Sequence, residues 1–135
     1  MSRPSLCFFP QYFLPTIKTP VFIVMSAFDQ IQIRYNLLPA DEICLLNHNC
    51  TYERLEAMQD LRKHVLFALP KACPLERGLW ITSCIAHDIP YDWNKTFPQV
   101  LRDWYINKSY LPVIDGSDTP KNCTLQGISP HHPHT

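Results

Sequence analysis

Two continuous apolar runs occur in the chain, and each one leads to a single ionisable residue. The first covers residues 21–25 and leads to Asp29, and the second covers residues 79–85 and leads to His87. Long β-branched and aromatic runs are typical of strands that are covered on both faces of a parallel sheet. The pattern therefore predicts two buried strands, and Gly78 opens the second.

A helix is predicted between these strands, from about residue 52 to residue 69. Thr51 can cap its start and Pro70 ends it. Apolar residues recur at helical spacing and leave the charged residues on the opposite face. The apolar face comprises Leu55, Met58, Leu61, Val65 and Leu69; the polar face comprises Glu53, Arg54, Gln59, Arg62 and Lys63.

A second helix is predicted over residues 97–107, where Thr96 and Gln99 form a capping-box pattern. Its expected apolar face comprises Phe97, Val100, Leu101, Trp104 and Tyr105. A short helix also fits residues 30–37. Residues 1–19 read as an irregular, proline-punctuated entry, and residues 116–135 as a flexible tail rich in Pro, Ser and His.

The order strand, helix, strand, helix predicts a right-handed crossover and a parallel sheet, and hence an α/β fold. Two parallel strands cannot cover their own edges. We therefore expect further strands upstream, so that residues 1–115 form only part of a domain.

The charge balance narrows the range of partners. Lys and Arg number 12, Asp and Glu number 12, and the formal net charge is zero. Nucleic acid is not an expected partner, because phosphate binding needs clustered positive charge. No apolar stretch is long enough to span a bilayer, so no membrane partner is expected.

Six cysteines in 135 residues favour an oxidising compartment. Four Asn-x-Ser/Thr sequons point the same way and mark glycosylation candidates at Asn49, Asn94, Asn107 and Asn122. Secretion is the prediction, although residues 1–20 show no signal peptide. The alternative is a cytosolic protein with free thiols.

Cys44 and Cys50 lie close together in a polar loop, with His48 between them. A local disulfide is the preferred interpretation, because no second Cys/His pair follows at zinc-finger spacing. Cys7 and Cys84 are expected to pair with cysteines that these 135 residues do not contain. The histidines near the end of the chain (His131, His132 and His134) lack a fixed geometry, so neither a metal nor an organic cofactor is predicted.

The chain order Asp29 then His87 matches the second and third members of the α/β-hydrolase triad. The first member, a serine on a Gly-x-Ser-x-Gly turn, is missing, because the three glycines of the chain flank no serine at that spacing. Each residue also has a structural interpretation. Asp29 can act as a helix N-cap after a strand, and His87 as a partly buried loop histidine.

Several linked blocks resemble those of plant pectin acetylesterases, the family that also contains the animal Notum lipid deacylase. They are Cys-Phe-Phe-Pro-Gln at 7–11, Thr-Pro-Val-Phe-Ile-Val-Met-Ser-Ala-Phe-Asp-Gln at 19–30, Gly-Leu-Trp-Ile-Thr-Ser-Cys-Ile-Ala-His at 78–87 and Asp-Trp-Tyr at 103–105. The resemblance implies the carboxyl-terminal part of an α/β-hydrolase-like parallel sheet with flanking helices. It also implies a Ser-Asp-His triad that removes acetyl groups from cell-wall pectin outside the cell.

On this resemblance Asp29 and His87 correspond to the catalytic aspartate and histidine of the family, and the serine block would lie before Met1. Asp88 replaces the cysteine that usually follows the histidine, and its charge is expected to raise the pKa of His87. Trp93, in the loop after His87, is the best candidate for stacking on a sugar ring. The alternatives are a Notum-like deacylase of another ester and a truncated remnant without activity.

Overall fold

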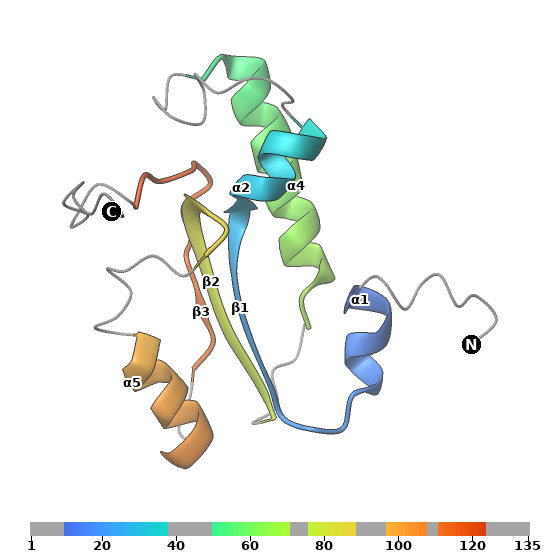
Figure 1. The fold of residues 1–135 in the computed structure, drawn as a ribbon, viewed down its shortest axis with the longest axis vertical. Coiled ribbons are helices and arrows are strands. Elements are labelled where there is room, and N and C mark those ends of the chain that lie inside the picture. The colour runs from blue at the N-terminus through green and yellow to red at the C-terminus, as the bar shows by residue number, and fades with distance from the viewer. Residues whose placement is uncertain (1–9, 38–49, 71–75, 89–96, 108–110, 124–135) are drawn as a thin grey trace, which may run out of the picture.

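The computed structural model describes residues 10–37, 50–70, 76–88, 97–107 and 111–123. These residues build a parallel sheet with strand order β1-β2-β3, in which β1 spans Val21–Asp29, β2 spans Arg77–Ala86 and β3 spans Val113–Ile114 (Figure 1). The predicted α/β class and both predicted strands are confirmed. β3 was not predicted, because a strand of two residues is too short to show any periodicity.

The helices lie close to their predicted positions. α4 spans Tyr52–Ala68, and α5 spans Phe97–Arg102 and continues as a π-helical turn over Asp103–Asn107. A one-turn helix, α2, spans Gln30–Gln32 and leads into a second π-helical turn over Ile33–Leu37.

Two local expectations were wrong. Part of the entry segment is helical, since α1 spans Pro10–Phe13 and a 3₁₀ turn follows over Leu14–Thr16. Thr51 occupies the N-cap position of α4, but its side chain makes no capping hydrogen bond. The first turn is instead closed by its backbone carbonyl, which accepts from the Leu55 N–H at 3.1 Å.

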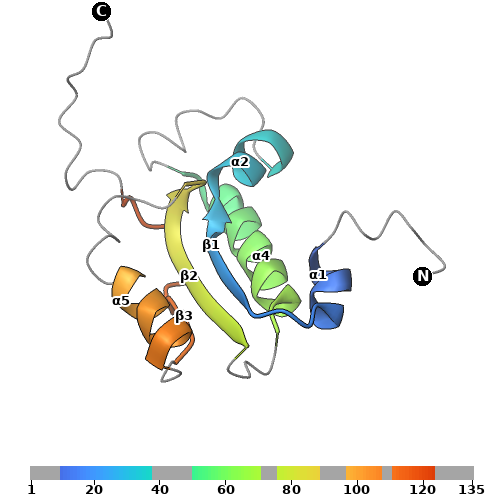
Figure 2. The same ribbon diagram turned by 60° about the horizontal axis from the view of Figure 1, so that its bottom comes forward.

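α4 covers one face of the sheet, as Figure 2 shows. Four of its five predicted apolar residues, all except Leu55, pack into two clusters that include residues of β1. The upper cluster contains Phe28, Ile33, Met58 and Ile85, flanked by Leu37, Cys50 and Leu61. The lower cluster contains Ala27, Leu79 and Ile81, flanked by Ile23, Met25, Val65, Leu66 and Leu69.

Arg62, predicted to lie on the polar face of the helix, is not fully exposed to solvent. Its side chain is half-buried, and Nη2 donates to the Asp115 carbonyl at 3.2 Å. The guanidinium therefore ties α4 to the segment that follows β3.

An aromatic cluster covers the other face of the sheet, beneath α5. Phe22 of β1 lies with its ring centroid 5.1 Å from Trp104 and 6.1 Å from Phe97, and Trp80 of β2 lies 5.7 Å from Phe97. All three pairs adopt edge-to-face geometry, which aromatic rings favour. Trp104 is buried as predicted, whereas Tyr105 is 69% exposed and does not belong to the packed face.

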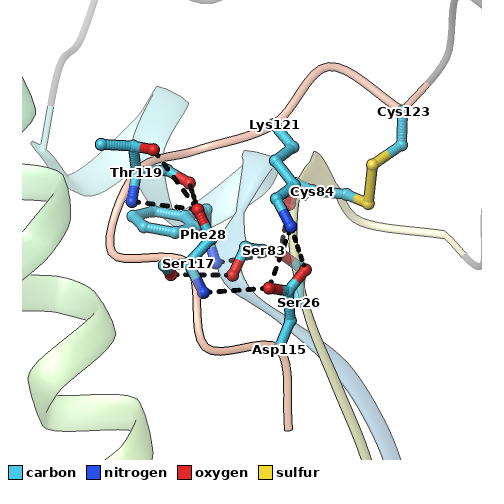
Figure 3. Close-up of a disulfide and its surroundings, with 9 residues drawn as sticks. All are labelled: Ser26, Phe28, Ser83, Cys84, Asp115, Ser117, Thr119, Lys121 and Cys123. Atoms are coloured by element: carbon cyan, nitrogen blue, oxygen red, sulfur yellow. Dashed lines mark hydrogen bonds and ion pairs between the residues drawn. A yellow bond between two sulfur atoms is a disulfide. The ribbon is translucent and has the colours of Figure 1, made fainter.

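Residues 115–123, the edge segment, run beside β2 (Figure 3). Ile85 N–H donates to the Lys121 carbonyl at 2.9 Å, Lys121 N–H donates to the Ser83 carbonyl at 2.7 Å, and a disulfide joins Cys84 to Cys123. Pairing of Cys84 with a cysteine outside these 135 residues was therefore a wrong expectation. The part of the predicted flexible tail up to residue 123 is held against β2, and residues 124–135 lie outside the described residues. The domain boundaries themselves stay predictions.

Gly78 is required by close packing. It pairs with Phe22 across the sheet, and a Cβ at this position would overlap the Phe22 ring. Since that ring is fixed in the aromatic cluster, it has little room to move away.

We expect Gly78→Ala to lower the free energy of unfolding by about 1–3 kcal/mol, as overpacking of a core does. Urea denaturation provides the measurement. Gly116→Ala is the matched control, because no atom lies within 4 Å of a Cβ built there, and it should change stability by less than about 0.5 kcal/mol. Phe22→Ala should cost less in the Gly78→Ala background than alone. Equal effects of the two glycine substitutions would contradict the packing argument.

Candidate active site

The two ionisable residues at the ends of the apolar runs meet in the folded chain. The His87 Nδ1 atom lies 2.9 Å from the Asp29 Oδ2 atom. The pairing of the strands explains this contact, since Asp29 is opposite Ala86, the residue before His87. Residues that end neighbouring parallel strands emerge at the same edge of the sheet, where α/β proteins gather their functional groups.

Asp29 fills both roles that the sequence allowed. Its Oδ1 atom accepts a hydrogen bond from the Gln32 backbone N–H at 2.8 Å and so caps α2, while Oδ2 faces His87. The residue is only 9% exposed. A carboxylate held at both oxygens has a fixed orientation, which a group that orients an imidazole requires.

His87 is much more accessible than its partner, with 55% of its side chain exposed. The hydrogen bond to Asp29 and the charge of that carboxylate raise the pKa of His87 above its ordinary value of 6.5, and Asp88 adds a smaller contribution in the same direction. The predicted effect of Asp88 is therefore confirmed, although Asp29 has the larger effect. The pair stabilises the protonated imidazole.

The ring orientation determines which nitrogen can react. Since Nδ1 faces the carboxylate, Nε2 points away from Asp29 and, within the described residues, has no hydrogen-bond partner. A neutral imidazole oriented in this way carries its proton on Nδ1 and offers a lone pair at Nε2. This arrangement can accept a proton from a hydroxyl placed on the exposed side of the ring.

The structure does not describe every predicted site residue. Trp93, Cys44, Asn49 and Asn94 lie outside the described residues. Cys50 takes part in a disulfide, so the predicted pairing with Cys44 stays a prediction.

The asparagines of the other two sequons lie within the described residues. Asn107 ends the π-helical turn after α5, and Asn122 is half-buried between Lys121 and the disulfide-bonded Cys123. Glycosylation of all four asparagines stays a prediction. The part of the chain that is described contains no group of three or more His, Cys, Asp or Glu side chains that could hold a metal ion.

Sequence reasoning missed two buried polar residues in the strands that lead to the pair. Ser26 and Ser83 are buried polar residues in the two strands, and both hydroxyls bond backbone carbonyls, of Cys84 and Ser117 respectively. A serine within an apolar strand was the only available signal, because a buried hydroxyl must find a partner.

Comparison with known proteins defines the family. The family model described as Pectinacetylesterase matches residues 1–126. This chain belongs to the pectin acetylesterase family. Pectin acetylesterase 11 of Arabidopsis thaliana is 32% identical over 148 residues, which cover 94% of this chain and 38% of that protein. Pectin acetylesterase 4 of the same plant is 34% identical over 132 residues, covering 84% of this chain and 32% of that protein.

These matches confirm the resemblance to pectin acetylesterases that the linked blocks indicate. The chain spans well under half the length of the curated relatives that it matches. No solved structure gives a match. Within the described residues of this pectin acetylesterase family member, none of the helices has the length and apolar character needed to cross a membrane.

We expect Asp29→Asn to lower the pKa of His87 toward 6.5, because the substitution removes both the charge and the acceptor that raise it. Asparagine is as good an N-cap as aspartate, so its side-chain oxygen can still cap α2. Its NH₂ group would then face the imidazole in place of the carboxylate oxygen. The measurement is an NMR titration of the His87 ring protons. Asp88→Asn is the matched control and should lower the pKa less, since Asp88 is the smaller cause. A larger effect of Asp88→Asn would contradict the assignment.

Proposed function

We propose that Asp29 and His87 are the aspartate and histidine of a Ser-Asp-His triad that hydrolyses acetyl esters of pectin. The contact of 2.9 Å between Nδ1 and Oδ2 carries this proposal, together with membership of the family. The serine would come from a part of the fold that these 135 residues do not contain. The sheet would then be the carboxyl-terminal part of an α/β-hydrolase-like sheet.

In this mechanism Nε2 of His87 removes the proton from the serine hydroxyl as the serine oxygen attacks the acetyl carbonyl carbon. The bond between that carbon and the sugar oxygen breaks, and the imidazolium returns the proton to the departing sugar hydroxyl. The acetyl group stays on the serine until water, activated by the same nitrogen, releases acetate. No metal ion or organic cofactor takes part.

Asp29 contributes to both halves of this cycle. It holds the proton on Nδ1, so that the lone pair of Nε2 faces the serine, and it stabilises the imidazolium that forms after proton transfer. The raised pKa of His87 reflects this stabilisation of the imidazolium by Asp29. The fixed position of the carboxylate means that little reorganisation is needed during the reaction.

We also propose secretion to the cell wall, where acetylated pectin is the substrate. Disulfide bonds at Cys84, Cys123 and Cys50 support an oxidising compartment. Trp93 stays the proposed sugar contact in the loop after His87.

One observation favours a non-catalytic alternative. The N-cap bond to Gln32 alone would account for a buried Asp29. A remnant without activity could keep this bond for structural reasons. A Notum-like deacylase of another ester would keep the same pair and differ in the shape of the acyl pocket.

The test is a chimera in which this chain replaces the matching part of pectin acetylesterase 11. We expect it to release acetate from acetylated pectin, and His87→Ala to reduce kcat by roughly 10⁶-fold, as loss of the triad histidine does. His64→Ala, at an exposed site on α4, is the matched control and should stay within a few-fold of the parent. Full activity in His87→Ala would exclude the proposal. A folded chimera without activity would support the remnant, and activity confined to longer acyl esters would support the deacylase.

The pH dependence gives a further expected outcome. Since the base must be neutral, kcat/KM of the chimera should rise with pH through the raised pKa of His87 and stay low below it. Asp29→Asn should move this acid limb to lower pH while reducing the plateau by about 10⁴-fold, because an amide favours the wrong tautomer. An acid limb that does not move in Asp29→Asn would show that another group controls it.

A further inference from the structure

The strands that carry Asp29 and His87 do not pair in a constant register. Val21 to Ser26 pair with Arg77 to Thr82 one for one, but Phe28 pairs with Ile85 and Asp29 with Ala86. Two residue steps on β1 thus match three steps on β2. The extra residue is a bulge, a feature that is rare between parallel strands and is often found next to active sites.

The bulge determines whether the pair can form. If the one-for-one register of residues 21–26 continued to the end of β1, Asp29 would lie opposite Ile85. His87 would then come two residues after the partner of Asp29 instead of one. One residue of strand corresponds to about 3.3 Å. A displacement of that size would break the 2.9 Å contact between the imidazole and the carboxylate, because hydrogen bonds weaken steeply beyond about 3.2 Å.

The Ser26 hydroxyl lies at this irregularity and bonds both strands. Its Oγ atom accepts from the Phe28 N–H at 2.9 Å and donates to the Cys84 carbonyl, so one side chain links the residue after the step on β1 to the bulged part of β2 (Figure 3). Phe28 and Cys84 are 0% and 3% exposed, respectively. A broken ladder leaves such groups without backbone partners, and buried groups need one.

On the side of β2 away from β1, the bulge is bonded to the edge segment. Lys121 bonds the backbone of Ser83 and Ile85, and the disulfide fixes Cys84 to Cys123. These contacts hold β2 to the edge segment but do not reach β1. Ser26, by contrast, is a β1 side chain that hydrogen-bonds directly to the bulged part of β2, at the Cys84 carbonyl.

We propose that Ser26 is a positioning residue, whose hydroxyl locks the β2 bulge and thereby sets His87 opposite Asp29. Its importance for catalysis rests on the proposed function, whereas its effect on the Asp29–His87 contact does not. The charged groups that act on the His87 ring are Asp29 from β1 and the adjacent Asp88. The Asp29 contribution depends on distance and geometry, so it reports the position of the ring.

The test is an NMR titration of the His87 ring in the full 135-residue chain and its variants. Ser26→Ala should give a pKa between those of the parent and of Asp29→Asn, because the ring moves away from the carboxylate. Ser26→Thr keeps a hydroxyl and should restore the parental pKa. Ser83→Ala is the matched control: this buried hydroxyl lies on the same bulge but bonds the Ser117 carbonyl, and the parental pKa should be kept.

A parental pKa in Ser26→Ala would overturn the proposal, as would equal shifts in Ser26→Ala and Ser83→Ala. If Ser26→Ala does not fold, Ser26→Cys replaces it, since a thiol has a similar shape and is a weak donor. A parental pKa in that variant also overturns the proposal. The titration needs no esterase activity, so it separates the two ideas. A shifted pKa with an inactive chimera would mean that Ser26 positions a pair without a catalytic role.

Discussion

Parallel pairing between β1 and β2 is the constraint on which the rest of the structure depends. It brings Asp29 and His87, which are 58 positions apart in the sequence, into hydrogen-bond contact. Each residue lies at the end of a different strand, so the contact depends on the pairing of the two strands. Strand pairing determines the position of backbone atoms far better than a loop does, and this explains why the two groups follow directly after strands. The contact tolerates no slip of register, so the irregular step near Ser26 belongs to the site as much as the pair itself.

Both faces of this strand pair are covered, but in different ways. α4 contributes aliphatic side chains and Met58 to one face, whereas the other is filled by Phe22, Trp80, Phe97 and Trp104. Aliphatic clusters adapt to the curvature of a twisted sheet, while edge-to-face rings demand defined distances. The aromatic side is therefore the one that imposes a glycine on the neighbouring strand.

The sequence predicted the parts that depend on local pattern. The apolar runs at 21–25 and 79–85 identify the strands, the helical spacing of Leu55 to Leu69 identifies α4, and the strand ends identify Asp29 and His87. Three features depend on contacts between distant segments and leave no local signal. They are the two-residue β3, the Cys84–Cys123 disulfide and the step in register near Ser26. Tyr105 is a fourth case. Helical spacing places it beside Trp104 on an apolar face, but it cannot show which residues of that face are covered in the folded chain.

The disulfide has a topological consequence for the chain around His87. Cys84 and Cys123 are 39 residues apart, so the covalent ring that they close contains the histidine, Asp88, the whole of α5 and β3. A single cut of the backbone inside this ring opens it without releasing either piece. A protease would therefore separate the histidine from its strand only after a second cut or a reduction step.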